Sequence, residues 1–113
     1  MTAYKPGDVV LVSYPLGQGS SAKKRLALVI SPEDYNQAAG ELIIAQITSR
    51  VSAPPRPGDY LIQDWQEAGL PRPALVRARL ATLKASLVLR KLGELGEGDL
   101  RAIRVTLQTV LGS

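Results

Sequence analysis

Apolar and polar residues alternate along much of the first two thirds of the chain, which is the pattern of strands with one buried face. The alternation is clearest in residues 8–14 and 41–48, and it recurs in residues 25–31, where both faces carry apolar side chains. A shorter strand is predicted over residues 59–63, and one or two more over residues 73–83. The pattern therefore predicts a mainly β protein.

Glycine and proline separate these segments. Residues 16–22 form a Gly- and Ser-rich loop, and residues 50–58 contain three prolines, which exclude a strand ladder and predict a surface loop. Short helical turns are predicted over residues 32–36 and 64–69, the second of them closed by Gly69.

The last segment follows a helical period. Leucine, isoleucine and valine recur at helical spacing over residues 97–111, with Asp99 in the first turn and Gly112 just beyond the end. One amphipathic helix must therefore pack on the sheet. The predicted fold class is α+β, mainly β: a small SH3-like barrel or strongly curved antiparallel sheet with a C-terminal helix, forming a single domain over residues 1–113.

The composition restricts the chemistry more than it restricts the fold. The 113 residues are 45% hydrophobic and 21% charged, which is ordinary for one globular domain with one core. There is no Cys and no His, so the chain has no disulfide, no thiol or imidazole catalyst, and no metal held by Cys or His. Any enzymatic reaction must use Arg, Lys, Asp, Glu, Ser, Thr or Tyr.

Neither a signal peptide nor a membrane span is expected. The N-terminal residues have no apolar run after their charge, and no stretch approaches the roughly 20 apolar residues that a membrane-spanning helix needs. We therefore expect a cytoplasmic protein without a membrane partner.

Basic residues are unevenly distributed along the chain. Fourteen Lys and Arg residues against ten Asp and Glu residues give a net charge of +4. Residues 68–93 contain six basic residues and no acidic one, and Lys23, Lys24 and Arg25 form a second cluster. If the two groups meet in the fold, they form a basic face that can neutralise phosphates. The alternative is two solvated charge runs that keep a small protein soluble.

Carboxylates were considered as metal ligands, because a metal-dependent nuclease needs two or three that converge. The candidates, Asp8, Asp59, Asp64 and Glu67, are scattered along the chain, and their neighbours favour roles in turns and helix starts. No metal site is therefore predicted. The Gly- and Ser-rich loop lacks the spacing of a nucleotide-binding P-loop and leads into a strand.

Another set of polar residues lies at the ends of two predicted strands. Arg25 begins the strand over residues 25–31, and Thr48 and Ser49 stand where the strand over residues 41–48 ends. If these strands pair as a hairpin, a guanidinium and two hydroxyls meet at one edge of the sheet, where they can hold a phosphate. The alternative is an ordinary surface arginine and an ordinary strand threonine.

Five segments in order resemble one known family. The runs GDVVLVSYP, KKRLALVISPEDYN, ELIIAQITSR, PGDY with DWQEAGL, and ALVRARLATL followed by RKLGELGEGDL are together similar to the MazF/PemK toxins of type II toxin-antitoxin systems. The resemblance covers about residues 5–111.

The resemblance implies an endoribonuclease toxin that cleaves single-stranded RNA, usually messenger RNA, without a metal or other cofactor. It also implies a homodimer that a cognate antitoxin inhibits, with binding to operator DNA only through the antitoxin complex. The family's catalytic arginine falls on Arg25, and its catalytic threonine or serine falls on Thr48. The expected RNA-binding residues are Lys23, Lys24, Ser49, Arg50, Arg77 and Arg79.

The sequence departs from the usual pattern of the family in two places. Leu26 stands where proline commonly follows the catalytic arginine, and residues 78–81 replace an acid-Gln-Ile-Arg run on the late strand. The second change alters groups that read bases. The cleavage sequence of relatives is therefore not expected to carry over.

RNA supplies its own nucleophile, the 2′-hydroxyl, so the enzyme need only align it, transfer protons and stabilise charge, and the product is a 2′,3′-cyclic phosphate. A guanidinium, with a pKa above roughly 12, is a poor general base. The expected role of Arg25 is therefore to stabilise transition-state charge, while Thr48 holds the phosphate. For removal of the 2′ proton, a water, a nearby carboxylate and an unusually perturbed Arg25 are the alternatives.

A second function from another class fits the same fold. A small SH3-like module without catalysis could bind nucleic acid or a protein such as a topoisomerase subunit, because fold alone does not fix function.

Overall fold

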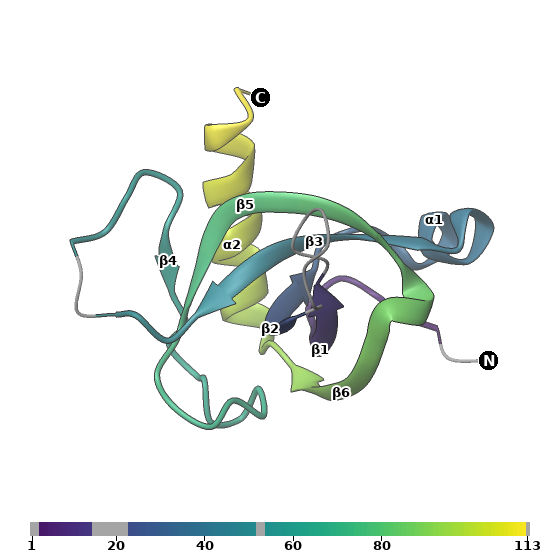
Figure 1. The fold of residues 1–113 in the computed structure, drawn as a ribbon. Helices are drawn as coiled ribbons and strands as arrows, with labels where there is room; N and C mark the ends of the chain where they lie inside the picture. Colours follow the sequence, from purple (N-terminus) through teal and green to yellow (C-terminus); the bar gives the residue numbers. More distant parts are fainter. Residues whose placement is uncertain (1–2, 15–22, 52–53, 113) are drawn as a thin grey trace.

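The computed structural model describes residues 3–14, 23–51 and 54–112, and the predicted Gly- and Ser-rich loop lies outside them (Figure 1). In chain order the elements are β1 (Asp8–Tyr14), β2 (Lys23–Val29), α1 (Glu33–Ala39), β3 (Glu41–Thr48), β4 (Tyr60–Leu61), β5 (Leu75–Lys84), the 3₁₀ turn η1 (Ala85–Leu87), β6 (Val88–Glu94) and α2 (Glu97–Val110). No helix in this part of the chain is long and apolar enough to cross a membrane.

Most of the predicted elements are confirmed. The strands over residues 8–14 and 41–48 are found at their predicted ends, and the C-terminal helix ends one residue early, at Val110. The helical turn after Pro32 is longer than predicted and extends to Ala39, where Gly40 closes it with a φ of 67°. Over residues 64–69 the chain forms turns and no regular helix, although Gly69 does end them in a left-handed conformation, with a φ of 85°.

The strand β6 is absent from the sequence prediction. It is an edge strand, whose one partner among the described strands is β1, and all of its side chains are exposed or half-buried. Half of Leu89 is exposed, for example, so an apolar side chain stands among the exposed positions. Because the strand buries no full face, its sequence lacks the alternation that identified the others.

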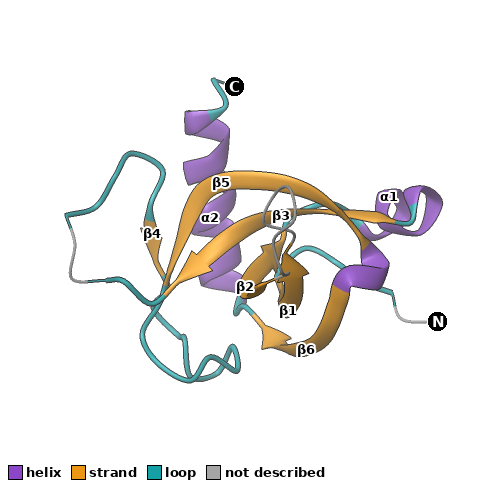
Figure 2. Ribbon diagram, viewed as in Figure 1, coloured by secondary structure: helices purple, strands orange, loops and turns teal. Residues whose placement is uncertain are grey.

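The six strands form one antiparallel sheet in the order β4-β5-β3-β2-β1-β6 (Figure 2). No ladder within the described residues joins β4 to β6, so the sheet is open. The mainly β class and the C-terminal helix are therefore confirmed, whereas the small SH3-like barrel and the strong curvature that the sequence predicted are not what the open sheet shows. The predicted hairpin of β2 and β3 is present, with α1 in the connection between its strands.

Both faces of this sheet carry apolar side chains, which form two separate clusters. The first cluster lies between the sheet and α2, where Ile103 and Leu107 pack on strand residues such as Val9 and Leu28. The second lies on the opposite face, and among the described residues neither α1 nor α2 contributes to it. Its buried members are Val10, Val12, Ala27, Val29, Leu42, Ile44 and Leu83. Alternation along each strand places successive residues in different clusters, as the apolar residues on both faces of β2 predicted.

A bulge in β5 separates two arginines that strict alternation would place on one face. Gln46 pairs with Arg77 and the preceding residue, Ala45, pairs with Leu80, so Ala78 and Arg79 are extra residues opposite a single step of β3. Arg77 is 9% exposed, whereas Arg79 is exposed. The bulge therefore gives the two guanidiniums different surroundings.

Asp99 joins α2 to the segment after β4. One of its carboxylate oxygens, Oδ1, accepts hydrogen bonds from the Tyr60 hydroxyl at 2.5 Å and from the Gln63 N–H at 3.0 Å, and Oδ2 accepts one from the Asp64 N–H at 3.0 Å. Burial opposes ionisation of Asp99, but these hydrogen bonds prevail and lower its pKa below the ordinary value. Burial and the bond to Asp99 raise the pKa of Tyr60 to about 12.

An ionic cluster joins β6 to β1. Asp8, which is fully buried, lies with its Oδ1 3.1 Å from Lys91 Nζ, and Glu94 lies 2.7 Å from Lys5 Nζ and 3.0 Å from Lys91 Nζ. Hydrogen bonds from Lys5 and Lys91 lower the pKa of Glu94 to about 2. The edge strand is therefore attached by charge as well as by its ladder.

The Tyr60–Asp99 hydrogen bond gives a stability prediction. Tyr60→Phe should lower the free energy of unfolding by about 2 kcal/mol near neutral pH, because it removes a donor to a buried carboxylate. Urea denaturation measures the loss, with Tyr35→Phe on α1 as the matched control that should change little. An equal effect of the two substitutions would contradict the assigned role.

The same pair predicts how that loss depends on pH. The lowered pKa of Asp99 stabilises the fold above the ordinary aspartate pKa of roughly 4, and the contribution is lost as the pH falls through the folded value. The raised pKa of Tyr60 stabilises below roughly 10 and the contribution is lost as the pH approaches 12. The difference in stability between parent and Tyr60→Phe should thus be widest between these limits.

Candidate functional site

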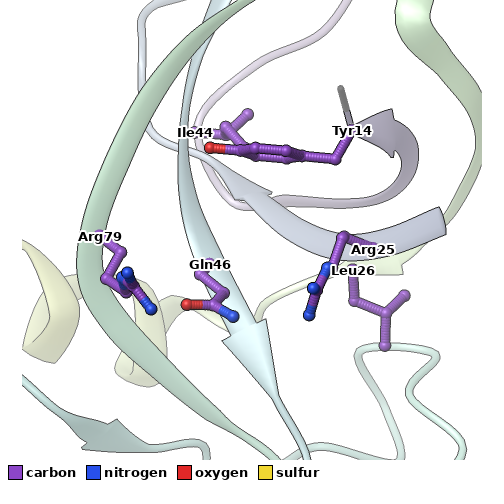
Figure 3. A pocket seen from close by; sticks show the side chains of 6 residues that line it. All are labelled: Tyr14, Arg25, Leu26, Ile44, Gln46 and Arg79. Atoms are coloured by element: carbon purple, nitrogen blue, oxygen red, sulfur yellow. The ribbon is translucent and has the colours of Figure 1, made fainter. Parts of the chain in front are cut away.

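A pocket of about 220 Å³ opens on the face of the sheet opposite α2. Figure 3 shows the side chains that line it, which come from four strands that are neighbours in the sheet. The lining residues are Tyr14, Arg25, Leu26, Ile44, Gln46 and Arg79. The pocket therefore lies where the second apolar cluster, represented by Ile44, gives way to polar side chains.

The polar side chains of the pocket form a row across the strands. Arg79 extends from β5, Gln46 from β3 and Arg25 from β2, which is the order of these strands in the sheet (Figure 3). Arg25 and Gln46 point to this face because each stands two residues along its strand from a member of the second apolar cluster, Ala27 and Ile44 respectively. Two guanidiniums thus flank one amide.

These groups have no polar partner among the described residues. The side chains of Arg25, Gln46, Arg79 and Tyr14 make no hydrogen bond or ion pair there, and Asp and Glu are absent from the residues that line the pocket. By contrast, Lys5 and Lys91 are engaged by carboxylates elsewhere on the sheet. A pocket with two such cations favours an anion, and a guanidinium can bind a phosphate through two parallel hydrogen bonds.

Thr48 lies near the pocket but does not line it. The β2–β3 ladder ends with the pair Ala27 and Gln46, and Arg25 and Thr48 each lie two residues beyond it, at the same end of the hairpin. The hairpin pairing that the sequence predicted is therefore confirmed. The Thr48 Oγ1 accepts a hydrogen bond from the Arg50 N–H at 3.2 Å, and no hydrogen bond joins it to Arg25.

The other predicted RNA-binding residues fall into two groups. Lys23 and Lys24 are exposed at the start of β2, and Ser49 and Arg50 are exposed just after β3. These four residues flank the end of the hairpin that carries Arg25. Their positions agree with one continuous basic region around the pocket.

Arg77 has different surroundings from the other predicted RNA-binding residues. Its side chain is 10% exposed, and its Nε lies 3.4 Å from Oδ1 of Asp59, whose side chain is 4% exposed. A guanidinium buried against a carboxylate has little surface to offer to a phosphate. Arg79, which lies within the bulge of β5, has no such partner among the described residues and lines the pocket. The burial of Arg77 therefore favours a role in the fold, and its contact with RNA stays a prediction.

The carboxylates that were candidate metal ligands do not form a metal site among the described residues. Asp8 and Asp59 hold turns, since their Oδ2 atoms accept hydrogen bonds from the backbone N–H of Lys5 at 3.0 Å and of Arg56 at 2.8 Å. In the ranges that the structure describes, no three acidic side chains lie close enough together to hold a metal ion.

Sequence reasoning missed Tyr14 and Gln46 as pocket residues. Tyr14 ends β1 and Gln46 lies within β3, and each occupies an ordinary strand position with no motif around it. One signal was available, however. In the alternation of β3, Gln46 is the one amide on the face where Leu42 and Ile44 are buried, and a polar residue in an apolar series merits attention.

Known proteins match this chain over nearly its whole length. Residues 5–111 match the family described as PemK-like, MazF-like toxin of type II toxin-antitoxin system. Among curated proteins, none matches the sequence.

Solved structures match over nearly their full lengths. MazF from Deinococcus radiodurans is 24% identical with a TM-score of 0.78, covering 100% of both chains. In a MazE-MazF complex from the same organism, the matching chain is 25% identical with a TM-score of 0.77 and 100% of both chains covered. An endoribonuclease in complex with its cognate antitoxin, from a mycobacterial species, is 22% identical, with a TM-score of 0.78 and 97% of this chain and 96% of that chain covered.

The Arg77–Asp59 pair gives a second stability prediction. Asp59→Asn should lower the free energy of unfolding by about 3 kcal/mol, because it leaves a buried guanidinium without its counter-charge. Chemical denaturation measures the loss. Glu97→Gln is the matched control, since it breaks an exposed ion pair with Arg101 that is worth less than about 1 kcal/mol. Similar losses in both variants would show that Arg77 does not need Asp59.

Proposed function

The chain belongs to the PemK-like, MazF-like toxins of type II toxin-antitoxin systems, and on this premise we propose that it cleaves single-stranded RNA, messenger RNA in particular, at the pocket that contains Arg25. One observation carries the proposal. The residue that matches the family's catalytic arginine lines a cationic pocket and has no hydrogen-bonding or ionic partner in the described chain. Cleavage in the cell would inhibit growth until a cognate antitoxin binds.

Arg25 is assigned to charge stabilisation. When the 2′-hydroxyl attacks the neighbouring phosphorus, the phosphate gains negative charge before the 5′-oxygen leaves, and the products are a 2′,3′-cyclic phosphate and a free 5′-hydroxyl. A guanidinium placed at the phosphate stabilises that charge without losing a proton. Removal of one such donor typically costs a factor of roughly 100 to 1,000 in rate.

Thr48 is assigned to hold the same phosphate. It lies at the same end of the hairpin as Arg25, and its hydroxyl can donate to a phosphate oxygen while accepting from the Arg50 N–H. The exposed cations Lys23, Lys24 and Arg50, together with Arg79 and the exposed hydroxyl of Ser49, extend the contact along the RNA. The reaction in this account requires no metal and no other cofactor.

Assembly follows the pattern of the family. Solved relatives form complexes with their cognate antitoxins. We therefore propose that this chain acts as a homodimer in the cytoplasm, that an antitoxin inhibits it by covering the RNA-binding face, and that operator DNA is contacted only through that complex.

The competing function is a non-catalytic module of SH3-like shape, which would keep the basic face and lose cleavage. Incubating the protein with a long single-stranded RNA in the presence of EDTA separates the two. Fragments that end in a 2′,3′-cyclic phosphate support the ribonuclease, whereas RNA that stays intact supports the binding module.

Arg25→Ala should abolish that cleavage, with at least about a 100-fold loss of rate, because it removes the charge that stabilises the transition state. Arg25→Lys should recover only part of the rate, since an ammonium cannot form the two parallel hydrogen bonds. Arg104→Ala on the exposed face of α2 is the matched control and should cleave like the parent. Comparable cleavage by Arg25→Ala and the parent would refute the assignment.

Salt should weaken RNA binding steeply. For single strands, the slope of log affinity against log salt concentration is about −0.7 for each neutralised phosphate, so Arg79→Gln should flatten it by about that amount. The probe is a 2′-O-methylated RNA, which cannot be cleaved by this route. Arg101→Gln on α2 should leave the slope unchanged, and a flat response of the parent would mean that its cations face away from RNA.

A further inference from the structure

The pocket has a shape and a chemistry beyond those of a phosphate site. We propose that it holds one unpaired base of the RNA, with the ring of Tyr14 as its stacking surface and the amide of Gln46 reading its edge. The proposal rests on the ribonuclease function proposed above and names the residues that give the site its base preference.

The size of the pocket favours one base over a whole ligand. Its volume of about 220 Å³ lies below the roughly 300 to 1,000 Å³ of pockets that enclose drug-sized molecules. Such a pocket takes one part of a longer molecule that continues across the surface. A single-stranded RNA has this form, because each base can leave the stack while the backbone stays outside.

Tyr14 supplies an aromatic surface at one side. Its ring is half-buried, rests against the second apolar cluster and borders the pocket, as Figure 3 shows. Its hydroxyl has no hydrogen bond to any residue in the described ranges. An aromatic ring fixed on one side and open on the other is the usual stacking surface for an unpaired base.

Gln46 supplies the group that reads the base. Its amide is half-buried between Arg79 and Arg25, and the described chain offers it no hydrogen-bond partner. It has a donor and an acceptor but no charge, so the flanking guanidiniums attract phosphates far more strongly than it does. A base edge, by contrast, presents donors and acceptors that match an amide.

Different side chains therefore bind different parts of the nucleotide. Arg25 and Arg79 hold backbone phosphates on either side of Gln46, and the base enters between the Tyr14 ring and the Gln46 amide. Half-buried groups without partners penalise a base that leaves them unpaired, and this penalty is the physical source of selectivity.

The test compares the bases at cut sites in a pool of random-sequence RNA. Gln46→Met keeps the length of the side chain and removes both hydrogen-bonding groups, so the base preference at one position next to the cut should disappear while cleavage continues. Gln37→Met, on the exposed surface of α1, is the matched control and should retain the parent's preference.

Stacking is tested by binding, independently of cleavage. Tyr14→Leu should weaken binding of 2′-O-methylated decamers of each of the four bases by about 10-fold, whereas Tyr14→Phe should retain the parent's affinity. Tyr35→Leu, on α1, is the control. Thermal unfolding of each variant shows that it is folded.

The outcomes separate this proposal from the function on which it rests. If the parent does not cleave RNA, the ribonuclease proposal fails. If the parent cleaves and Gln46→Met keeps its cut-site preference, the reading role of Gln46 is wrong. If Gln46→Met does not cleave RNA, its binding to the four 2′-O-methylated decamers is measured instead. An order of affinity among the four bases that matches the parent's then overturns the reading role of Gln46. Equal binding by Tyr14→Leu and the parent overturns stacking.

Discussion

One helix cannot cover both faces of a six-stranded sheet, and this constraint organises the molecule. The helix α2 closes the face that carries Val9, Leu28 and Ala45. The opposite face buries its apolar side chains without α2, in part through the turn between β5 and β6, which brings Leu87 and Val88 against the second cluster. These residues cover one end of that face. At the other end its strands carry Arg25, Gln46 and Arg79, and the pocket lies there.

The fold also explains why neighbouring cations have different roles. Arg77 and Arg79 are two residues apart, yet the first lies against Asp59 and the second lines the pocket. Lys5 and Lys91 are occupied by Glu94 and Asp8, and they attach the edge strand. Arg25, Lys23 and Lys24, which have no such partner within the described ranges, lie at the end of the β2–β3 hairpin. Net charge alone therefore says little about where an anion binds, because pairing decides which charges are available.

Much of this could be predicted from the sequence, for physical reasons. Alternation identified β1 and β3 because each has buried faces, and helical spacing identified α2 because Ile103 and Leu107 must meet the sheet. Arg25 was found through its place at a strand start and through the family resemblance. The edge strand β6 was missed because it buries no full face. The burial of Arg77 against Asp59 could not be predicted, because only the fold brings these two side chains together. Tyr14 and Gln46 were missed because only the pairing of distant strands brings them together.

The central claim is that RNA is bound and cut on the face of the sheet opposite α2. The most direct measurement is a crystal structure of this protein with a short 2′-O-methylated RNA that spans a mapped cut site. The account predicts that the phosphate at the cut site lies within hydrogen-bonding distance of the Arg25 guanidinium, with the RNA running past Gln46 and Arg79. RNA bound along α2, or bound with Arg25 facing solvent, would contradict it.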